Sequence, residues 1–232
     1  MNEPLKISLR SDIEIDNPEE RIREYCAIEI YKGYDDHHGV NNNITQDDVW
    51  AANKLYAMID RYDPTESSRI LSSTAIPTLL AKVRDRDLST ISESEWISEK
   101  ENIAQLLRAW LSIRGIGLAK ATKILHLKRP KLIPILDNYV VKFLTGIDMS
   151  EVFDKEKVLK IGLDALDISR RIIRQNLDAF YKLQRGLNDL PIPLTIVRLF
   201  DILCWTTEKW DIRGITTGAY GRAGKSLKSS LY

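Results

Sequence analysis

Apolar residues recur at intervals of three and four along much of this chain, which is the spacing of amphipathic helices. The clearest example lies between residues 103 and 111, where isoleucine, leucine and tryptophan form one apolar face. The Ser-x-x-Glu pattern from Ser98 to Glu101 has the form of a capping box, so we expect this helix to begin at Ser98. Gly115 predicts where the helix ends.

The segment that follows predicts two more helices separated by extended backbone. One helix begins after Gly117 and ends before the sequence KRPKLIP, because Pro130 and Pro134 favour extended backbone. Asp137 comes next, and aspartate directly before an apolar helical pattern is a preferred N-cap residue. The order of helix, glycine-containing turn and helix is the layout of a helix-hairpin-helix motif.

Further helices are predicted on both sides of this motif. Pro18 and Thr45 mark two helix starts in the first half of the chain. The first sixteen residues alternate loosely between apolar and polar, which predicts a short extended segment. The expected fold is therefore mainly α, a multi-helix bundle with a helix-hairpin-helix motif and a short N-terminal extended segment. Apolar spacing predicts the later helices over residues 152–166, 169–187 and 194–205.

On this interpretation the chain has three parts. An N-terminal helical part covers residues 1–95, and the part that contains the helix-hairpin-helix motif covers 96–212. Residues 213–232 are rich in glycine and serine and carry several basic residues, so we expect a flexible basic tail.

Composition narrows the class of protein. The 232 residues are 44% hydrophobic and 29% charged, which is typical of a folded soluble protein. Cys26 and Cys204 are too few for a four-cysteine zinc or iron–sulfur site, and we expect no metal and no cofactor. The sequence has no secretion signal and no apolar run long enough to cross a membrane, so we expect a cytoplasmic protein without a membrane partner. The polar Asp35–His38 sequence predicts a solvated loop.

A local excess of positive charge surrounds the predicted hairpin. The chain has a net charge of only +1, yet no Asp or Glu occurs between Arg108 and Leu136. Glycines let a backbone approach a phosphate closely, and the start of the second helix presents free N–H groups to an anion. We therefore expect backbone contacts with DNA from the hairpin and from two lysines of the second helix. The predicted contact residues are Arg114, Gly115, Ile116, Gly117, Lys120 and Lys123.

The sequence IRGIGLAKATKIL…PILDNYVVKFL resembles the helix-hairpin-helix DNA glycosylase superfamily over about forty residues. Ile113, Ile116 and Ala121, together with the two glycines, occupy motif positions, and Asp137 matches the position of the family's catalytic aspartate. The resemblance implies a DNA-glycosylase-like fold. Ala119 stands where bifunctional members have a nucleophilic lysine, which implies a monofunctional enzyme. Arg114 replaces the proline that is usual in the motif.

A second resemblance concerns the phrases KRPKLIPILDNYV and LFDILCW, which are similar to an uncharacterised bacterial family of helix-hairpin-helix-related proteins. That resemblance implies no activity. It leaves open a non-catalytic DNA-binding or protein-interaction module in which Asp137 only caps its helix.

The resemblance to DNA glycosylases implies hydrolysis of a base N-glycosidic bond. Asp137 would then stabilise the positively charged sugar, and a flipped-out base would lie between aromatic walls. Candidates for those walls are Trp50, Trp110, Tyr139 and Trp205.

Overall fold

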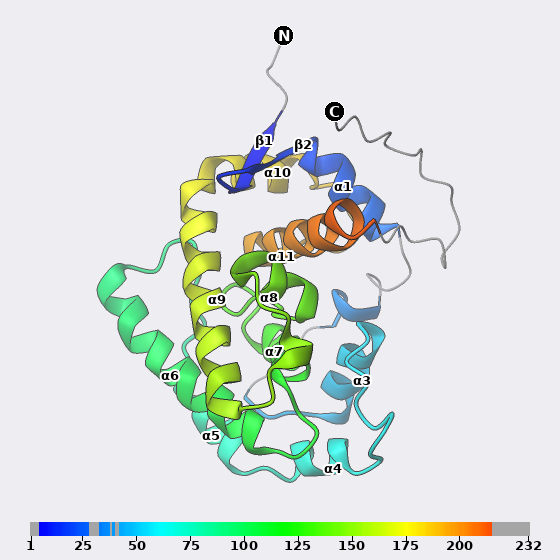
Figure 1. Ribbon diagram of the computed structural model, residues 1–232, viewed down its shortest axis with the longest axis vertical. Helices are drawn as coiled ribbons and strands as arrows, with labels where there is room; N and C mark the ends of the chain where they lie inside the picture. The colour runs from blue at the N-terminus through cyan, green and yellow to red at the C-terminus, as the bar shows by residue number, and fades with distance from the viewer. Residues whose placement is uncertain (1–4, 28–32, 38, 40–41, 215–232) are drawn as a thin grey trace.

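Helices form most of this protein, as the apolar spacing predicts (Figure 1). The structure, a computed structural model, describes residues 5–27, 33–37, 39 and 42–214. Most of the predicted basic tail, from residue 215 onward, therefore lies outside the described residues. The α-helices are α1 (Pro18–Cys26), α3 (Gln46–Lys54), α4 (Glu66–Leu71), α5 (Ala75–Leu80), α6 (Glu93–Ser112), α7 (Leu118–Lys128), α8 (Asn138–Thr145), α9 (Lys155–Gln175), α10 (Leu177–Gly186) and α11 (Ile196–Thr206).

The N-terminal extended segment is a small antiparallel hairpin. Strand β1 (Lys6–Arg10) pairs with β2 (Ile13–Asp16), and Ile7 lies opposite Ile15 with both side chains buried. The hairpin lies at the end of the molecule where α1 and α10 meet (Figure 1). The predicted short extended segment is thus confirmed, and its apolar face adds to the helical core.

Helix α9 runs along much of the molecule and packs against α6 and α8 (Figure 1). The sequence predicted a break at residues 167–168, and this prediction is wrong because the apolar spacing continues to Ile173 and the helix continues to Gln175. The break lies at Asn176 instead. Its side-chain amide donates to Ser8 O at 2.9 Å, and its Oδ1 accepts from Ser8 N at 3.1 Å. The break therefore coincides with a contact to strand β1, 168 residues away in the sequence.

Helix α6 begins six residues earlier than the Ser98 pattern predicted. The capping box is formed by Ser92 and Glu95, whose side chains each bond the backbone N–H of the other. Glu99, which lies within the predicted Ser98–Glu101 capping box, is instead buried in the helix and accepts from Arg84 N at 2.8 Å. The start of α3 is as predicted, because Thr45 and Asp48 form a capping box.

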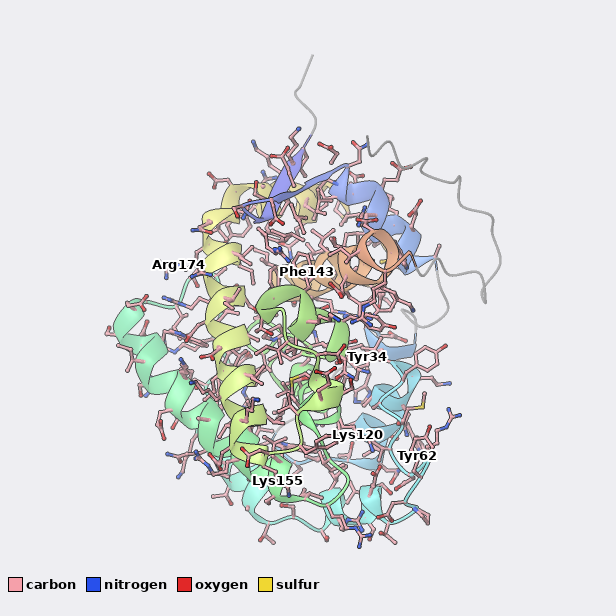
Figure 2. All side chains as sticks on the ribbon, viewed as in Figure 1. Tyr34, Tyr62, Lys120, Phe143, Lys155 and Arg174 are labelled. Carbon is pink, nitrogen blue, oxygen red and sulfur yellow. The ribbon has the colours of Figure 1, made fainter. Side chains whose placement is uncertain are left out.

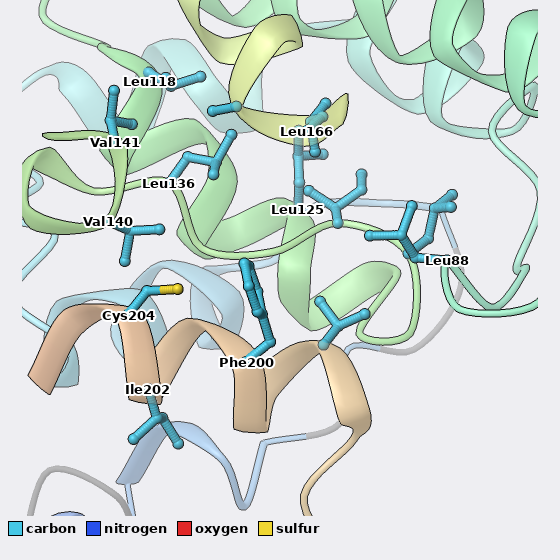
Figure 3. Packing of buried hydrophobic residues seen from close by; sticks show 14 of the residues in the cluster. Leu88, Leu118, Leu125, Leu136, Val140, Val141, Leu166, Phe200, Ile202 and Cys204 are labelled. Atoms are coloured by element: carbon cyan, nitrogen blue, oxygen red, sulfur yellow. The ribbon is translucent and has the colours of Figure 1, made fainter. Parts of the chain in front are cut away.

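One hydrophobic cluster joins residues from the two larger predicted parts of the chain. Figure 3 shows Leu88 in the same packed region as Leu125, Leu166 and Phe200. All four side chains are fully buried. The protein therefore buries its apolar helix faces in a shared core, which also includes Ile116 in the turn between α6 and α7.

Among the residues that the structure describes, no helix has both the length and the hydrophobicity that a membrane span requires. Figure 2 shows polar side chains, among them Lys155 and Arg174, along α9.

Candidate functional site: a pocket around Asp137

A cavity of about 430 Å³ lies between the N-terminal end of α7, the start of α8 and the C-terminal half of α11. Its walls include the carboxylate-bearing residue Asp137, the lysines Lys123 and Lys209, and the aromatic residues Tyr139 and Trp205. The structure thus brings the predicted catalytic aspartate into a concave site, a setting typical of small-ligand and substrate binding.

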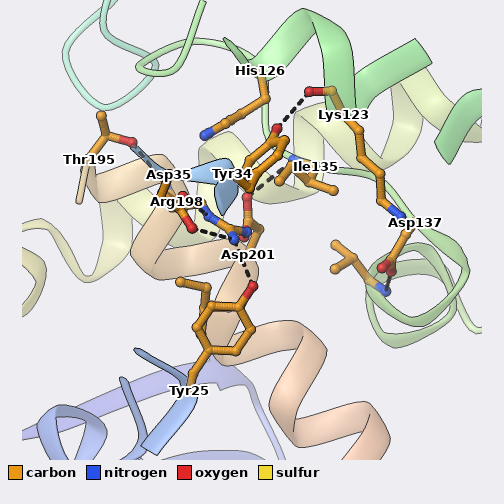
Figure 4. Close-up of polar contacts among 12 residues, drawn as sticks. Tyr25, Tyr34, Asp35, Lys123, His126, Ile135, Asp137, Thr195, Arg198 and Asp201 are labelled. Atoms are coloured by element: carbon orange, nitrogen blue, oxygen red, sulfur yellow. Dashed lines mark hydrogen bonds and ion pairs between the residues drawn. The ribbon is translucent and has the colours of Figure 1, made fainter. Parts of the chain in front are cut away.

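Three buried side chains hold the extended segment that leads to Asp137. His126 Nδ1 lies 2.7 Å from Ile133 O and donates to it, because a carbonyl oxygen only accepts. Asp201 Oδ2 accepts from Ile135 N at 3.2 Å, and Thr122 Oγ1 accepts from Leu136 N at 3.0 Å. Because α7 and α11 both bind this segment, Asp137 emerges at a fixed place between them (Figure 4).

Asp137 caps helix α8, as its position in the sequence predicts. Its Oδ1 accepts from Tyr139 N at 3.0 Å and from Val140 N at 3.1 Å. Within the described part of the chain, no hydrogen bond reaches Oδ2, and the residue lines the pocket. Oδ1 therefore caps the helix, while Oδ2 remains available to a ligand. Its catalytic role stays a prediction.

Lys123 lies in the pocket rather than on the hairpin surface. Only 6% of the residue is exposed, and its Nζ lies 3.4 Å from Tyr56 O. Figure 4 shows its amine directed toward Asp137. Burial lowers the pKa of the Lys123 amine, the Asp137 carboxylate raises it, and the buried Arg198 guanidinium lowers it further. Lys123 was expected to contact a phosphate backbone, but the residue is buried and its amine faces Tyr56 O and Asp137.

An aromatic cluster forms one wall of the pocket. The Trp205 ring makes edge-to-face contacts with Tyr25, Tyr139 and Trp210, with ring centroids 5.9, 6.0 and 6.1 Å apart. Lys209 Nζ lies 4.3 Å from the Trp205 ring centroid, so a cation covers part of this wall. Lys209 belongs to the π-helical segment η2 (Thr207–Ile212), which follows α11 directly.

Two of the four aromatic residues predicted to line a pocket do so. Tyr139 and Trp205 lie in the wall. Trp110 is fully buried in the core, and Trp50 is 61% exposed on α3. The sequence could not tell the pocket aromatics from the buried or exposed ones, because all four were predicted to lie on helices with similar apolar spacing. No pattern in the sequence predicted that Lys209 lines the pocket. Its position there depends on the π-helical segment η2, which follows α11.

A buried ion cluster lies beneath the pocket (Figure 4). Arg198 donates to Asp35 and Asp201, each at 2.6 Å, and to Tyr25 Oη at 2.7 Å. Burial raises the pKa of Asp201 to about 7, while Arg198 opposes that rise. Asp35 was expected in a solvated loop. That expectation is wrong for Asp35, because its carboxylate is needed to neutralise the buried guanidinium.

The two glycines of the predicted hairpin have different surroundings. Gly115 has a φ of +83°, and a Cβ there would overlap Glu66 Oε1. Gly117 is extended, at φ −104° and ψ 179°, and a Cβ there would meet nothing within 4 Å. Ile116, between them, is buried. The internal structure therefore explains glycine at position 115 but gives no reason for glycine at position 117.

The acid-free basic stretch is neutralised in part by acids from elsewhere in the chain. Lys120 Nζ lies 2.6 and 2.8 Å from the two carboxylate oxygens of Glu66. Lys128 forms a fully buried ion pair with Asp48 at 2.7 Å. Arg129 is also buried.

At the surface, Arg108 pairs with Glu156, whereas Arg114 and Lys131 are exposed. The local positive surface is therefore much smaller than the sequence predicted.

The fold and the site together define a mainly helical protein with a titratable, aromatic-walled pocket beside a glycine-containing turn. The chain belongs to a family of unknown function (DUF6308), whose sequence pattern matches residues 14–208. All of the pocket-lining residues except Lys209 lie within the matched range. No curated protein and no solved structure matches the chain.

Proposed function

We propose that this protein hydrolyses the N-glycosidic bond of a nucleobase in nucleic acid, as a monofunctional, DNA-glycosylase-like enzyme. The observation that carries the proposal is the position of Asp137 in the wall of the cavity with Oδ2 available. A planar base would lie against Tyr139 and Trp205, because aromatic faces stack on nucleobases. Stacking on the exposed face of Trp205 would require Lys209 to move aside.

The reaction would break the bond between C1′ of the sugar and the base nitrogen. The bonding electrons leave with the base, and the Asp137 carboxylate stabilises the positive charge that develops on the sugar. A water then attacks C1′, and its proton passes to Asp137. Ala119, in the same wall, offers no nucleophile for a covalent route at that position.

Nucleic-acid contact would come from the open side of the hairpin. Gly117 leaves room for a phosphate at the start of α7, where helix N–H groups and the helix dipole favour an anion. Arg114 and Lys131 are exposed cations of the basic stretch, and no acid among the described residues forms an ion pair with either. Two neutralised phosphates predict that log K falls with log salt concentration with a slope of about −1.8.

The alternative is a non-catalytic module that binds DNA or a protein. Two observations favour it: Asp137 has a complete structural role as the cap of α8, and most of the nearby cations have internal partners. In that case the pocket would bind a ligand without turnover.

Release of bases from DNA that carries damaged or mismatched bases tests the proposal. Asp137→Asn should abolish release while leaving the cap intact, because asparagine is an equally good N-cap residue. Asp154→Asn is the matched control, since Asp154 caps α9 in the same way, outside the pocket. The proposal fails if Asp137→Asn and Asp154→Asn release bases at the wild-type rate.

A further inference from the structure

The three lysines of α7 have different electrostatic surroundings. Lys120 pairs with Glu66, and Lys128 pairs with Asp48. Lys123 lies between them in sequence and is 6% exposed, yet no carboxylate of the described residues forms an ion pair with it. An amine buried without a counter-ion loses part of the stabilisation of its charged form. Lys123 is therefore the lysine of α7 best suited to supply a neutral amine.

The charged groups around the pocket support this assignment. Arg198 and Asp201 face the pocket from α11, Lys209 faces it from η2, and Asp137 faces it from the start of α8. Desolvation is the largest influence on the pKa of Lys123 and lowers it. Asp137 raises this pKa, and Arg198 lowers it further. The neutral form of the amine is therefore favoured relative to an ordinary lysine, and the amine lines a cavity large enough for a small molecule.

We propose that Lys123 is a carbonyl-reactive residue that forms an imine with an aldehyde bound in this pocket. Buried lysines with free amines are the usual Schiff-base residues of proteins. The resemblance to DNA glycosylases does not imply this role, because the matching position in that family is Ala119. The two residues lie four positions apart on α7, and both line the cavity.

The reaction balances without any oxidant or reductant. The Lys123 nitrogen donates its electron pair to the carbonyl carbon, and the carbonyl π electrons move to oxygen. Asp137 first carries one proton from the nitrogen to the alkoxide, which gives a neutral carbinolamine. It then carries the second N–H proton to the hydroxyl group, which leaves as water while the nitrogen electron pair forms the C=N bond. Figure 4 shows the Lys123 amine and the Asp137 carboxylate directed toward one another, as this proton transfer requires.

The ligand class is an aldehyde on a small compact molecule. Two sources share this chemistry: an aromatic aldehyde whose ring packs on Trp205 and Tyr139, and the open-chain form of a sugar. The cavity of about 430 Å³ accommodates either. A difference in labelling rate between the two would show whether the aromatic wall contributes to binding.

Reductive trapping on the wild-type full chain tests the proposal directly. The protein is incubated at neutral pH with pyridoxal or with glyceraldehyde in the presence of cyanoborohydride, and modified lysines are mapped by peptide mass spectrometry. We expect Lys123 to be modified at least about tenfold faster than Lys120 or the exposed Lys131, because its free-amine fraction is larger. Modification of the exposed lysines with Lys123 unmodified would overturn the proposal.

Variants separate the chemistry from general folding effects. Lys123→Met should remove the fast modification, whereas Lys160→Met, at an exposed lysine of α9 outside the pocket, should retain it. Asp137→Asn should slow trapping at Lys123 and leave trapping at Lys131 unchanged. An unchanged trapping rate at Lys123 in Asp137→Asn would show that Asp137 does not transfer the proton.

The mapping is performed on wild-type protein, so it does not depend on a variant that folds. It also does not depend on base hydrolysis. Trapping at Lys123 without base release would reject the glycosylase proposal alone, and base release without trapping would reject this inference alone.

Discussion

The Glu66 carboxylate lies against the α-carbon of Gly115, so a Cβ at that position would come within 3.0 Å of Glu66 Cδ and would overlap Oε1. The same carboxylate binds Lys120 and accepts from Asp60 N at 3.1 Å. An internal anion therefore occupies one side of the hairpin and neutralises the lysine that the sequence assigns to DNA. The other side, at Gly117, stays open.

Gly115→Ala and Gly117→Ala form a matched pair that distinguishes the two sides of the hairpin. Gly115→Ala should lower the free energy of unfolding by about 2 kcal/mol or more, because a positive φ and a buried neighbour both oppose a side chain. Gly117→Ala should stay within about 1 kcal/mol of wild type, since its backbone is ordinary and its surroundings are empty. Urea unfolding measures both variants.

Binding of a DNA duplex gives a second measurement on the same pair. Gly117→Ala should weaken DNA binding at constant stability, because the new methyl group would occupy the space that a phosphate needs. Equal affinity of wild type and Gly117→Ala would argue against phosphate contact at this turn.

Lys128→Met and Lys131→Met test which lysines of the basic stretch are buried in ion pairs and which are exposed at the surface. Lys128→Met leaves the buried Asp48 carboxylate without its cation and should cost about 3 kcal/mol or more of stability. Lys131→Met changes an exposed residue and should stay within about 0.5 kcal/mol of wild type. If Lys131 contacts a phosphate, its loss should reduce the salt slope of DNA binding by about 1. A stable Lys128→Met protein would contradict the buried pairing.

His126 should make the protein less stable in mild acid. Burial lowers the pKa of its imidazole to about 3, whereas an unfolded histidine titrates near 6.5. Stability from the neutral ring is thus present above pH 6.5 and is lost as the pH falls toward 3. Between pH 7.5 and pH 5, His126 should account for a loss of about 2 kcal/mol.

His126→Asn isolates this effect, because asparagine can still donate to Ile133 O but does not titrate. Asp201 acts in the opposite direction, since its raised pKa of about 7 favours the folded state as the pH falls, but it is present in both proteins. The unfolding free energy of the variant, measured in urea at pH 7.5 and pH 5, should therefore depend less on pH than that of wild type. Equal pH dependence in the two proteins would show that His126 is not the group responsible.

Asp137→Ala should destabilise the protein by about 1 kcal/mol through loss of the α8 cap, whereas Asp137→Asn should be close to wild type. Thermal unfolding of both variants checks this. The comparison also supplies the stability control for any activity measurement on Asp137→Asn. A large loss in Asp137→Asn would mean that the negative charge, and not the acceptor oxygen, stabilises α8.

Local patterns determined the helical class of this protein, the capping of α3 by Thr45 and the capping of α8 by Asp137. These features depend on neighbours within a few residues, so the sequence contains all the information they require. The boundary between α9 and α10 was missed, and it coincides with a contact between Asn176 and Ser8 that no local pattern encodes.

Only the tertiary structure decided which cations of the basic stretch are paired with acids and which residues line the pocket. The acids that neutralise Lys120 and Lys128 come from Glu66 and Asp48, more than fifty residues earlier in the chain, so a local count of charge predicted a surface where much of the charge is internal. Lys123 became a pocket residue because Tyr56 and Asp137, which are distant from it along the chain, line the same cavity. Charges interact through space, whatever their separation along the sequence. The sequence by itself therefore predicted Asp137 at the start of α8 but not the residues that surround it.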